Sequence, residues 1–340
     1  MKTRKILALL LSGMLAVSGL AGCGGTESQE PQASDTKSDI KLSFIVSYKD
    51  EYLGSLDMAV KAAAESKNCT LSSTDCADDM DKQIEYVRAA ASSGSDAAIV
   101  VLVDDNRAQE VVEAAGDMKV VFVNRIPQDD AVIDSDHVYI GSNEYTAGTE
   151  QGKMLANALK QAGKSDVSYL MFQGTAGLFH TVQRSERVLE VLKEEGITAT
   201  AAAEPIDCGY DRNKAMDQMS VLLSEGLDMS GVDCIIANND AMAMGVLESL
   251  RQNEVDTSGL MVVGIDGTNA GLMAIADGSM LATVYQNAAG QAAASVQAAI
   301  NLVTGAELTT DINYDVDEEN ENIIWIPYET VTAENVGDYL

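Results

Sequence analysis

The chain has 340 residues, and 46% of them are hydrophobic, which is enough to bury the cores of two domains or of one large bilobed unit. Its 53 acidic and 22 basic residues give a formal net charge of −31 at pH 7. This charge argues strongly against nucleic-acid binding, which needs a basic surface, and against docking on anionic lipid. It fits an exported protein, and it fits an acidic, solvated surface without a special role equally well.

Residues 1–22 have the pattern of a lipoprotein signal peptide. Three basic residues among the first five precede an apolar run at 6–20, which with about 15 residues is shorter than the ~20 that a membrane-spanning helix needs. The run ends in Leu20-Ala21-Gly22-Cys23, which resembles a bacterial lipobox. That resemblance implies that the signal is cut before Cys23 and that the Cys23 sulfur carries a lipid.

Residues 23–40 then comprise the lipidated Cys and a flexible tether. The segment after Cys23 holds too few apolar residues to build a core, so we expect it to span roughly 20–25 Å as a coil. Several acyl chains make a stable anchor. We therefore expect an extracytoplasmic protein, held on the outer face of the cell membrane by its N-terminal lipid.

From residue 41 the chain alternates short apolar strands with amphipathic helices. The helix expected over 52–67 shows the pattern, because Leu53, Leu56 and Val60 recur on one face. In the first half we expect further helices at 80–92 and 108–115, and strands at 42–47, 70–73, 97–103, 120–123 and 138–140.

The cycle restarts near residue 143. This alternation, with continuous apolar strands, indicates parallel sheets covered by helices on both faces. About ten strands are too many for one sheet, so we expect an α/β fold of two doubly wound parallel-sheet lobes. In the second half we expect helices at 145–161, 182–195, 212–224, 241–252, 270–276 and 288–302, and strands at 167–172, 199–203, 234–237, 260–265, 281–285, 312–314 and 323–326.

A run of short polar side chains, Asn238, Asn239 and Asp240, stands between the strand at 234–237 and the helix that follows it. Such residues are good helix N-caps, which is the simpler interpretation. One cap is enough to start a helix, however, and ligands of open α/β sheets bind beyond the carboxyl ends of the strands. At least one of the three is therefore a candidate ligand residue.

Polar and aromatic side chains follow the other strands too. Alone, each has an ordinary explanation as a helix cap, as a cover for a helix or as one half of an ion pair. Arg184, for example, could pair with Glu186 or Asp211. Together they combine groups that grip neighbouring hydroxyls with aromatic faces that pack on a pyranose ring, a set that suits an uncharged sugar. The candidate ligand-binding residues are Asp50, Tyr52, Asn124, Arg125, His180, Arg184, Tyr210, Asn239, Asp266 and Gln286.

Patterns typical of catalysis or of metal binding are missing. The two histidines, His137 and His180, do not have metal-ligand spacing, and there is no G-x-S-x-G nucleophile motif. The acidic segment 315–321 could bind calcium but is more simply a solvated loop. Whether Cys69 and Cys76 form a disulfide is left undecided by the sequence, because their spacing matches no known framework. We expect no enzyme activity, no cofactor and no metal site.

Four segments carry a resemblance to a known family: Ile236-Ala-Asn-Asn-Asp-Ala-Met-Ala-Met-Gly245, Val120-Val-Phe-Val-Asn124, Tyr139-Ile-Gly-Ser-Asn143 and Val263-Gly-Ile-Asp266. They resemble the sugar-binding lipoproteins of bacterial ABC importers, which have the type I periplasmic-binding-protein fold, and are most similar to galactose/glucose-binding proteins. This resemblance implies two lobes joined by a three-crossover hinge near residues 142, 286 and 322. The lobes would comprise residues 41–142 plus 287–322, and residues 143–286 plus 323–340.

The resemblance also implies roles for individual residues. Asp50 would accept a hydrogen bond from a sugar hydroxyl, Tyr52 and Tyr210 would stack on opposite ring faces, and Gln286 would be a hinge amide. Further contacts are implied for Asn124, Arg184, Asn239 and Asp266.

Two departures change what the resemblance implies. Leu178 and His180 replace a His and an Asp that contact the sugar in galactose/glucose-binding proteins, so part of the hydroxyl network differs. The calcium loop of those proteins has no counterpart before Val167.

We therefore expect a monomeric solute-binding protein that captures a monosaccharide, similar to galactose or glucose, and delivers it to an ABC transporter permease. A sensor that presents a sugar or small polar molecule to a chemoreceptor or a histidine kinase would have the same fold. A sugar-responsive repressor shares the two-lobed core, but the signal segment and the acidic charge argue against it.

Overall fold

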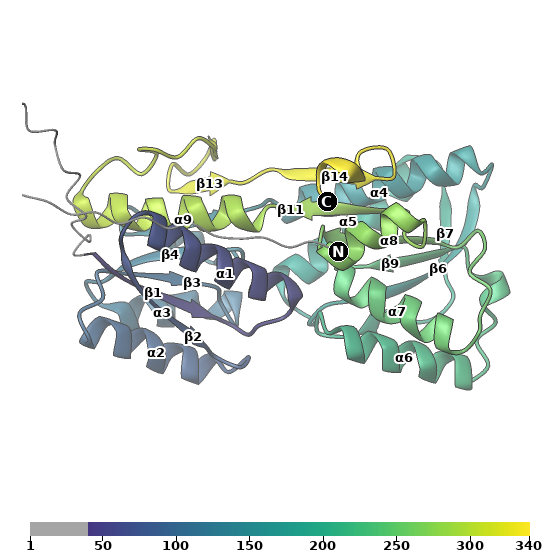
Figure 1. Cartoon of the computed structure of the whole chain (residues 1–340), viewed down its shortest axis with the longest axis horizontal. Helices are drawn as coiled ribbons and strands as arrows, with labels where there is room; N and C mark the ends of the chain where they lie inside the picture. The colour runs from purple at the N-terminus through teal and green to yellow at the C-terminus, as the bar shows by residue number, and fades with distance from the viewer. Residues whose placement is uncertain (1–39) are drawn as a thin grey trace, which may run out of the picture. The chain divides into compact units, whose positions relative to one another are not determined.

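The computed structural model describes residues 40–340. The expected signal peptide, Cys23 and nearly all of the tether lie outside the described residues. Residues 40–340 form two seven-stranded sheets, each covered by helices on both faces (Figure 1). This confirms the expected α/β architecture of two mainly parallel sheets.

The first sheet has the strand order β12-β13-β5-β4-β3-β1-β2, and only β12 runs antiparallel to its neighbour. Successive residues of a strand face opposite sides, so Phe44 packs with α1 (Glu51–Ser66) and α9 (Ala288–Thr304), and Ile45 packs with the helices of the other face. Those helices are α2 (Met80–Ser92) and α3 (Ala108–Ala115). The strands are β1 (Lys41–Val46), β2 (Thr70–Asp75), β3 (Ala97–Val100), β4 (Lys119–Val123), β5 (His137–Gly141), β12 (Asp315–Val316) and β13 (Ile323–Trp325).

The second sheet has the order β14-β11-β10-β9-β6-β7, with β8 beside β6 and only β14 antiparallel. One face is covered by α4 (Glu144–Gln161) and α5 (Phe179–Glu194). The other face is covered by α6 (Arg212–Ser224), α7 (Asp240–Gln252) and α8 (Asn269–Asp277). The strands are β6 (Asp166–Gln173), β7 (Thr198–Ala201), β8 (Ile206–Asp207), β9 (Cys234–Ala237), β10 (Met261–Asp266), β11 (Ala282–Gln286) and β14 (Tyr328–Thr332).

Four short 3-10 helices connect these elements. The first of them, η1, carries a buried carboxylate, Asp105, and the others lie in surface connections. Their bounds are η1 (Asp105–Arg107), η2 (Asp130–Val132), η3 (Met229–Gly231) and η4 (Val336–Asp338).

The chain passes between the two sheets three times: between β5 and α4, between β11 and α9, and between β13 and β14. The third passage comes later than residue 322, the position that the family resemblance implies. Ile323 pairs with Tyr139, so residues 323–325 lie in the first sheet and not with the second lobe. Pro327 then interrupts the pairing, because proline has no N–H to donate.

Most expected elements are present at or near their expected bounds, and the helices over 80–92, 108–115 and 212–224 match them fully. The strand expected at 312–314 is absent, and the two-residue β12 follows it instead. The edge strand β14 was not expected, because its five residues gain their order from pairing with β11. Cys69 and Cys76 lie in cores on opposite faces of the first sheet.

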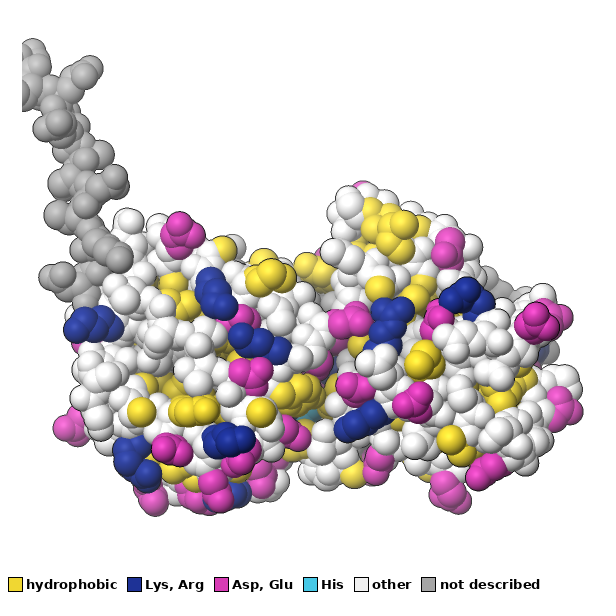
Figure 2. Space-filling model, turned by 60° about the horizontal axis from the view of Figure 1, so that its bottom comes forward, with side chains coloured by type: hydrophobic (Ala, Val, Ile, Leu, Met, Phe, Trp, Pro, Cys, Tyr) yellow, Lys and Arg dark blue, Asp and Glu magenta, His cyan; other side chains and the backbone are white. Residues whose placement is uncertain are grey.

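The molecular surface carries its charge in a dispersed form. Figure 2 shows basic side chains scattered singly among acidic ones over one face, with no broad basic patch on it. This distribution accords with the acidic net charge of the chain.

Asp240, the first residue of α7, is fully buried and holds three elements of the second sheet together. Its carboxylate accepts hydrogen bonds from the Thr283 hydroxyl (2.6 Å) on β11 and from the Thr268 amide (2.8 Å) ahead of α8. Gly264 and Gly271 leave room for it, since a Cβ at either position would come within 2.4 Å of a carboxylate oxygen. Burial raises the pKa of Asp240 to about 7.

This raised pKa predicts a pH-dependent stability. Between about pH 4 and pH 7 the unfolded chain has released the Asp240 proton while the folded chain keeps it, so the free energy of unfolding falls as pH rises and levels off above pH 7. We expect wild type to lose on the order of 3 kcal/mol through this group, and Asp240→Asn not to lose it. Urea denaturation at pH 5, 6, 7 and 8 measures both. A difference in stability between the two proteins that stays constant over this range would contradict the assignment.

Close packing of α7 on α6 predicts opposite effects for two helical glycines. A Cβ on Gly245 would lie 2.1 Å from the Arg212 carbonyl oxygen, whereas a Cβ on Gly54 in α1 meets nothing within 4 Å. Both changes to Ala gain helix propensity, by about 1 kcal/mol. Gly54→Ala should therefore stabilise the protein, and Gly245→Ala should destabilise it by about 1–3 kcal/mol. Equal midpoint shifts of the same sign in urea would show that the helices are not in close contact.

Candidate functional site

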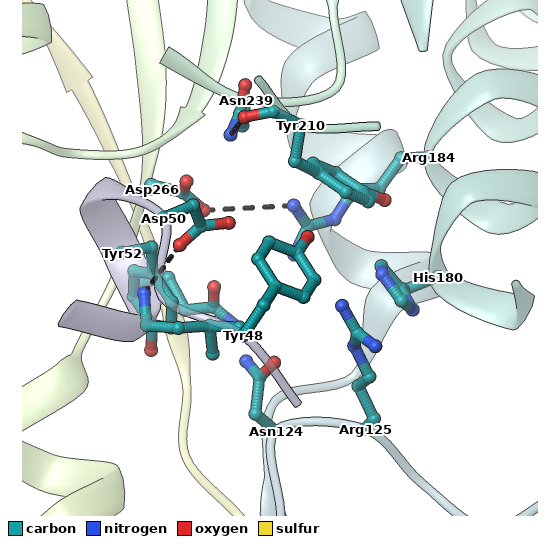
Figure 3. Close-up of a pocket in the computed structure, with 12 residues that line it drawn as sticks. Tyr48, Asp50, Tyr52, Asn124, Arg125, His180, Arg184, Tyr210, Asn239 and Asp266 are labelled. Atoms are coloured by element: carbon teal, nitrogen blue, oxygen red, sulfur yellow. Dashed lines mark hydrogen bonds and ion pairs between the residues drawn. The ribbon is translucent and has the colours of Figure 1, made fainter. Parts of the chain in front are cut away.

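Several strands of both sheets end at a common cavity, whose lining surrounds about 280 Å³ of space that is partly open to solvent. Figure 3 shows side chains from distant parts of the chain pointing into it. All ten expected ligand-binding residues line it, and Tyr48 and Leu53 complete the lining.

Asp50 and Arg125 form the charged part of the first-sheet side. Asp50 caps α1, because its Oδ1 accepts from the Leu53 amide at 2.7 Å, and its carboxylate also lines the cavity. Asp50 therefore both caps a helix and lines the cavity, so the two interpretations do not exclude each other. Burial raises the pKa of Asp50. The Arg125 guanidinium lies 5.2 Å from the centre of the Tyr48 ring and donates to the Leu102 carbonyl at 2.8 Å.

Three cavity residues have a left-handed backbone, which side-chain-bearing residues rarely adopt. They are Asn124 (φ 69°), Tyr210 (φ 62°) and Asp266 (φ 116°), each at or just beyond the end of a strand or loop. The Tyr139 hydroxyl donates to the Asn124 carbonyl at 3.0 Å and fixes that turn. Strained conformations of this kind cluster at functional sites, where surrounding contacts maintain them.

Tyr210 forms an aromatic wall on the second-sheet side. Its hydroxyl is 2.8 Å from the Thr181 hydroxyl, and the His180 ring stacks on it with 5.2 Å between centroids. Gly174 leaves space for the Tyr210 ring, because a Cβ at position 174 would lie 2.0 Å from atoms of that ring. Burial, with help from nearby arginines, lowers the pKa of His180 well below its usual value, so its imidazole is neutral.

The three polar residues after β9, Asn238, Asn239 and Asp240, have different roles in the structure. Asn239 caps α7 by accepting from the Met242 amide at 2.9 Å, and it also lines the cavity. Asn238 does not line the cavity, and its Oδ1 accepts from the Gly174 amide and the Ser185 hydroxyl, both at 3.1 Å. Asp240 points to β11 and α8 instead. One of the three thus faces the cavity.

Arg184 pairs with Glu144, and not with Glu186 or Asp211, the two partners considered from the sequence. Its Nε donates to Glu144 Oε2 at 2.6 Å and its Nη2 to Oε1 at 3.1 Å, with both side chains buried. Burial opposes the charge, but the Glu144 carboxylate raises the pKa of Arg184 well above its usual value. Nη2 also donates to the Tyr328 hydroxyl, and Nη1 lies 3.7 Å from Asp266 Oδ1.

Glu144 and Tyr328 are the members of this cluster that sequence reasoning missed. Glu144 opens a helix, where an acidic residue is common because it complements the helix dipole. Tyr328 begins β14, the strand that was not expected. The only available signal for Glu144 was its position beside the first passage between the sheets.

Two groups in the cavity have hydrogen-bonding capacity left over. The Tyr52 hydroxyl is buried and has no hydrogen-bond partner among the described residues. Burial raises the pKa of Asp266 well above its usual value, and the Arg184 guanidinium is the cation nearest to it. A ligand hydroxyl can donate to the carboxylate and accept from the tyrosine, so these groups suit a polyhydroxylated ligand.

Residues 40–340 contain neither a metal-binding cluster nor a membrane-spanning helix. That part of the chain contains no group of three or more His, Cys, Asp or Glu side chains arranged to hold a metal ion. It also contains no helix that is long and apolar enough to cross a membrane. In the acidic segment 315–321, Asp317 accepts from the Trp325 indole N–H at 2.8 Å and from two backbone amides.

Comparison with known proteins places this geometry in a family. Residues 42–307 match the model of the periplasmic binding protein domain. The chain is 28% identical over 267 residues to a putative rhizopine-binding protein of Rhizobium meliloti, covering 78% of this chain and 80% of that protein. It is 28% identical over 268 residues to the D-galactose/methyl-galactoside binding periplasmic protein MglB of Haemophilus influenzae, covering 76% and 78%.

A solved structure agrees with these relatives. An ABC transporter solute binding protein from Bacillus halodurans C-125 with bound myo-inositol matches with a TM-score of 0.75 and 27% identity, covering 90% of this chain and 99% of that chain. The family match spans most of the described residues, and the cavity lies where the two sheets meet. The chain therefore belongs to the periplasmic binding protein family, a family of non-catalytic solute-binding proteins.

Proposed function

We propose that the protein captures a neutral, polyhydroxylated ring, either a monosaccharide or a cyclic polyol, in the cavity between the two sheets. The observation that carries this proposal is the convergence of carboxylates, amides and guanidinium groups from both sheets, most of them buried, on one cavity. A hydroxyl both donates and accepts, so neighbouring hydroxyls can satisfy this alternating set. Tyr48, Tyr52 and Tyr210 supply apolar faces for the C–H groups of the ring.

Two observations narrow the choice of ring: a lining residue that differs from galactose/glucose-binding proteins, and the ligands named for similar proteins. His180 is neutral and stands where galactose/glucose-binding proteins have an Asp, so one charged acceptor is replaced by an imidazole that donates and accepts. The relatives bear names that refer to rhizopine and galactose, and the Bacillus halodurans protein holds myo-inositol. A cyclic polyol such as myo-inositol is therefore as strong a candidate as a hexose.

Binding would proceed by closure of the two halves around the ligand. A ligand that contacts both sides would stabilise the closed arrangement, and its higher affinity for that arrangement would set how far the population moves from open to closed. The groups for such contacts are Asp50 and Asn124 on one side and Asn239 and Asp266 on the other. The three passages between the sheets would act as the hinge. We further propose that the closed, monomeric protein delivers its ligand to the permease of an ABC transporter, while the lipid on Cys23 holds it at the membrane.

A thermal-shift screen of the purified protein tests the function. The panel contains myo-inositol, D-galactose, D-glucose, D-ribose and xylitol. A ligand at a hundred times its Kd stabilises the folded state by about 2.7 kcal/mol, so we expect at least one of these to raise Tm by roughly 5–10 °C. If no sugar or polyol shifts Tm at millimolar concentration, the proposed function fails.

Asp266→Asn tests whether the cavity is the site. The substitution keeps the shape of the side chain but replaces one acceptor oxygen by an N–H donor, so we expect the Kd of the identified ligand to rise 10- to 100-fold. Asp211→Asn is the matched control, because Asp211 caps α6 through the Lys214 amide and does not line the cavity. Isothermal calorimetry compares the two, and an unchanged Kd for Asp266→Asn would remove this carboxylate from the site.

A further inference from the structure

Glu144 lies behind the wall of the cavity. It is the first residue of α4, directly after the chain leaves the first sheet, and it is 5% exposed. Both carboxylate oxygens have partners within the protein: Oε2 accepts from Arg184, and Oε1 accepts from Arg184 and from the Tyr328 hydroxyl at 3.0 Å. Glu144 is not among the lining residues, so it acts on a ligand only through Arg184.

The pairing leaves Arg184 with little capacity for a ligand. A guanidinium has five N–H donors. Four of them are engaged within the protein, two with Glu144, one with the Tyr328 hydroxyl and one with the Asn238 carbonyl. The remaining Nη1 hydrogen lies on the guanidinium nitrogen nearest to Asp266. Arg184 therefore offers a ligand one donor and a positive charge that is already compensated.

The cavity has no excess of positive charge. Asp50 and Asp266 line it and Glu144 stands behind it, whereas the cations are the two arginines of the lining. His180 adds no positive charge, because its imidazole is neutral. Burial raises the pKa of Asp266 well above its usual value and so favours its neutral form, but Asp50 and Glu144 still equal the two arginines in number. An anionic ligand would therefore meet no excess of positive charge and would not recover the free energy of desolvation.

We propose that Glu144 is a specificity-determining residue that makes the cavity select neutral polyols and reject sugar acids and sugar phosphates. This role rests on the proposed function, because it names the class of ligand that the site takes. Without the Glu144 charge, the positive charge of Arg184 is no longer compensated and the local charge rises by one. A guanidinium with an uncompensated charge attracts carboxylates and phosphates through charge-assisted hydrogen bonds.

The same contacts connect Arg184 to all three passages between the sheets. Glu144 follows the first passage, Gln286 precedes the second and Tyr328 follows the third. The Tyr328 hydroxyl accepts from Gln286 Nε2 at 3.0 Å and donates to Glu144. A change at Glu144 also affects closure, and closure is common to every ligand. The ratio of two affinities is therefore the informative quantity, since an effect on closure alone cancels in it.

The experiment compares Glu144→Gln with wild type on pairs of neutral and anionic probes. The pairs are D-galactose with D-galacturonate, D-glucose with D-glucuronate, and myo-inositol with myo-inositol 1-phosphate. Gln keeps the shape of the side chain and an acceptor for Arg184 while removing the charge. We expect the Kd of at least one acid, divided by the Kd of its neutral counterpart, to fall at least tenfold in the variant, measured by calorimetry on the full chain.

Glu150→Gln is the matched control, because Glu150 lies on the same helix and pairs with Lys153 at the surface, away from the cavity. It should leave every ratio unchanged. An unchanged ratio in a folded Glu144→Gln protein, or a wild type that binds an acid as tightly as its neutral counterpart, overturns the role of Glu144.

The outcomes separate this role from the function itself. If wild type binds a neutral probe but Glu144→Gln shows no improved affinity for an acid, only the role of Glu144 is contradicted. A wild type that binds no neutral probe contradicts the proposed function, and a gain of acid binding by the variant still supports the role. If Glu144→Gln does not fold, Glu144→Asp replaces it. The shorter side chain withdraws the carboxylate from Arg184 and should move the same ratio by a smaller factor; no movement overturns the role.

Discussion

Burial of charged and amide side chains where two sheets meet is the constraint on which the rest of the structure depends. A buried charge or amide is costly unless it is paired, so each one in the cavity is supported by a specific neighbour. The Tyr139 hydroxyl holds the turn at Asn124, and Gly174 leaves room for the Tyr210 ring. The capacity that remains unpaired, at the Tyr52 hydroxyl and the Asp266 carboxylate, is what a polyhydroxylated ligand can satisfy.

The Arg184–Glu144 pair extends this constraint from the cavity to the connections between the sheets. One guanidinium contacts the cavity on one side and, through a carboxylate and a tyrosine, the residues beside the three passages on the other. In the proposed function, a ligand that changes the surroundings of Arg184 would act on the same contacts that closure would rearrange. Binding and closure would then share one polar network, through which the preference of a ligand for the closed arrangement would reach the proposed hinge.

Local patterns in the sequence were sufficient for the architecture and for the lining of the cavity. The alternation of strands and helices depends on neighbours close in sequence, and polar residues after parallel strands must gather at one edge, so Asp50, Asn124 and Asp266 could be brought together without coordinates. The sequence could not separate Asn239 from Asp240, because the groups that bind the Asp240 carboxylate away from the cavity, Thr268 and Thr283, lie 28 and 43 residues away. Glu144 and Tyr328 remained hidden because their roles depend on contacts made across the fold.

A crystal structure of the protein with the polyol that stabilises it most would show directly whether a single neutral ring binds between the two sheets and contacts both at once. We expect electron density for one ring in the cavity, with hydroxyls within hydrogen-bond distance of Asp50 on one side and Asp266 on the other. Density for the ligand elsewhere, or against only one of the two sheets, would contradict this expectation.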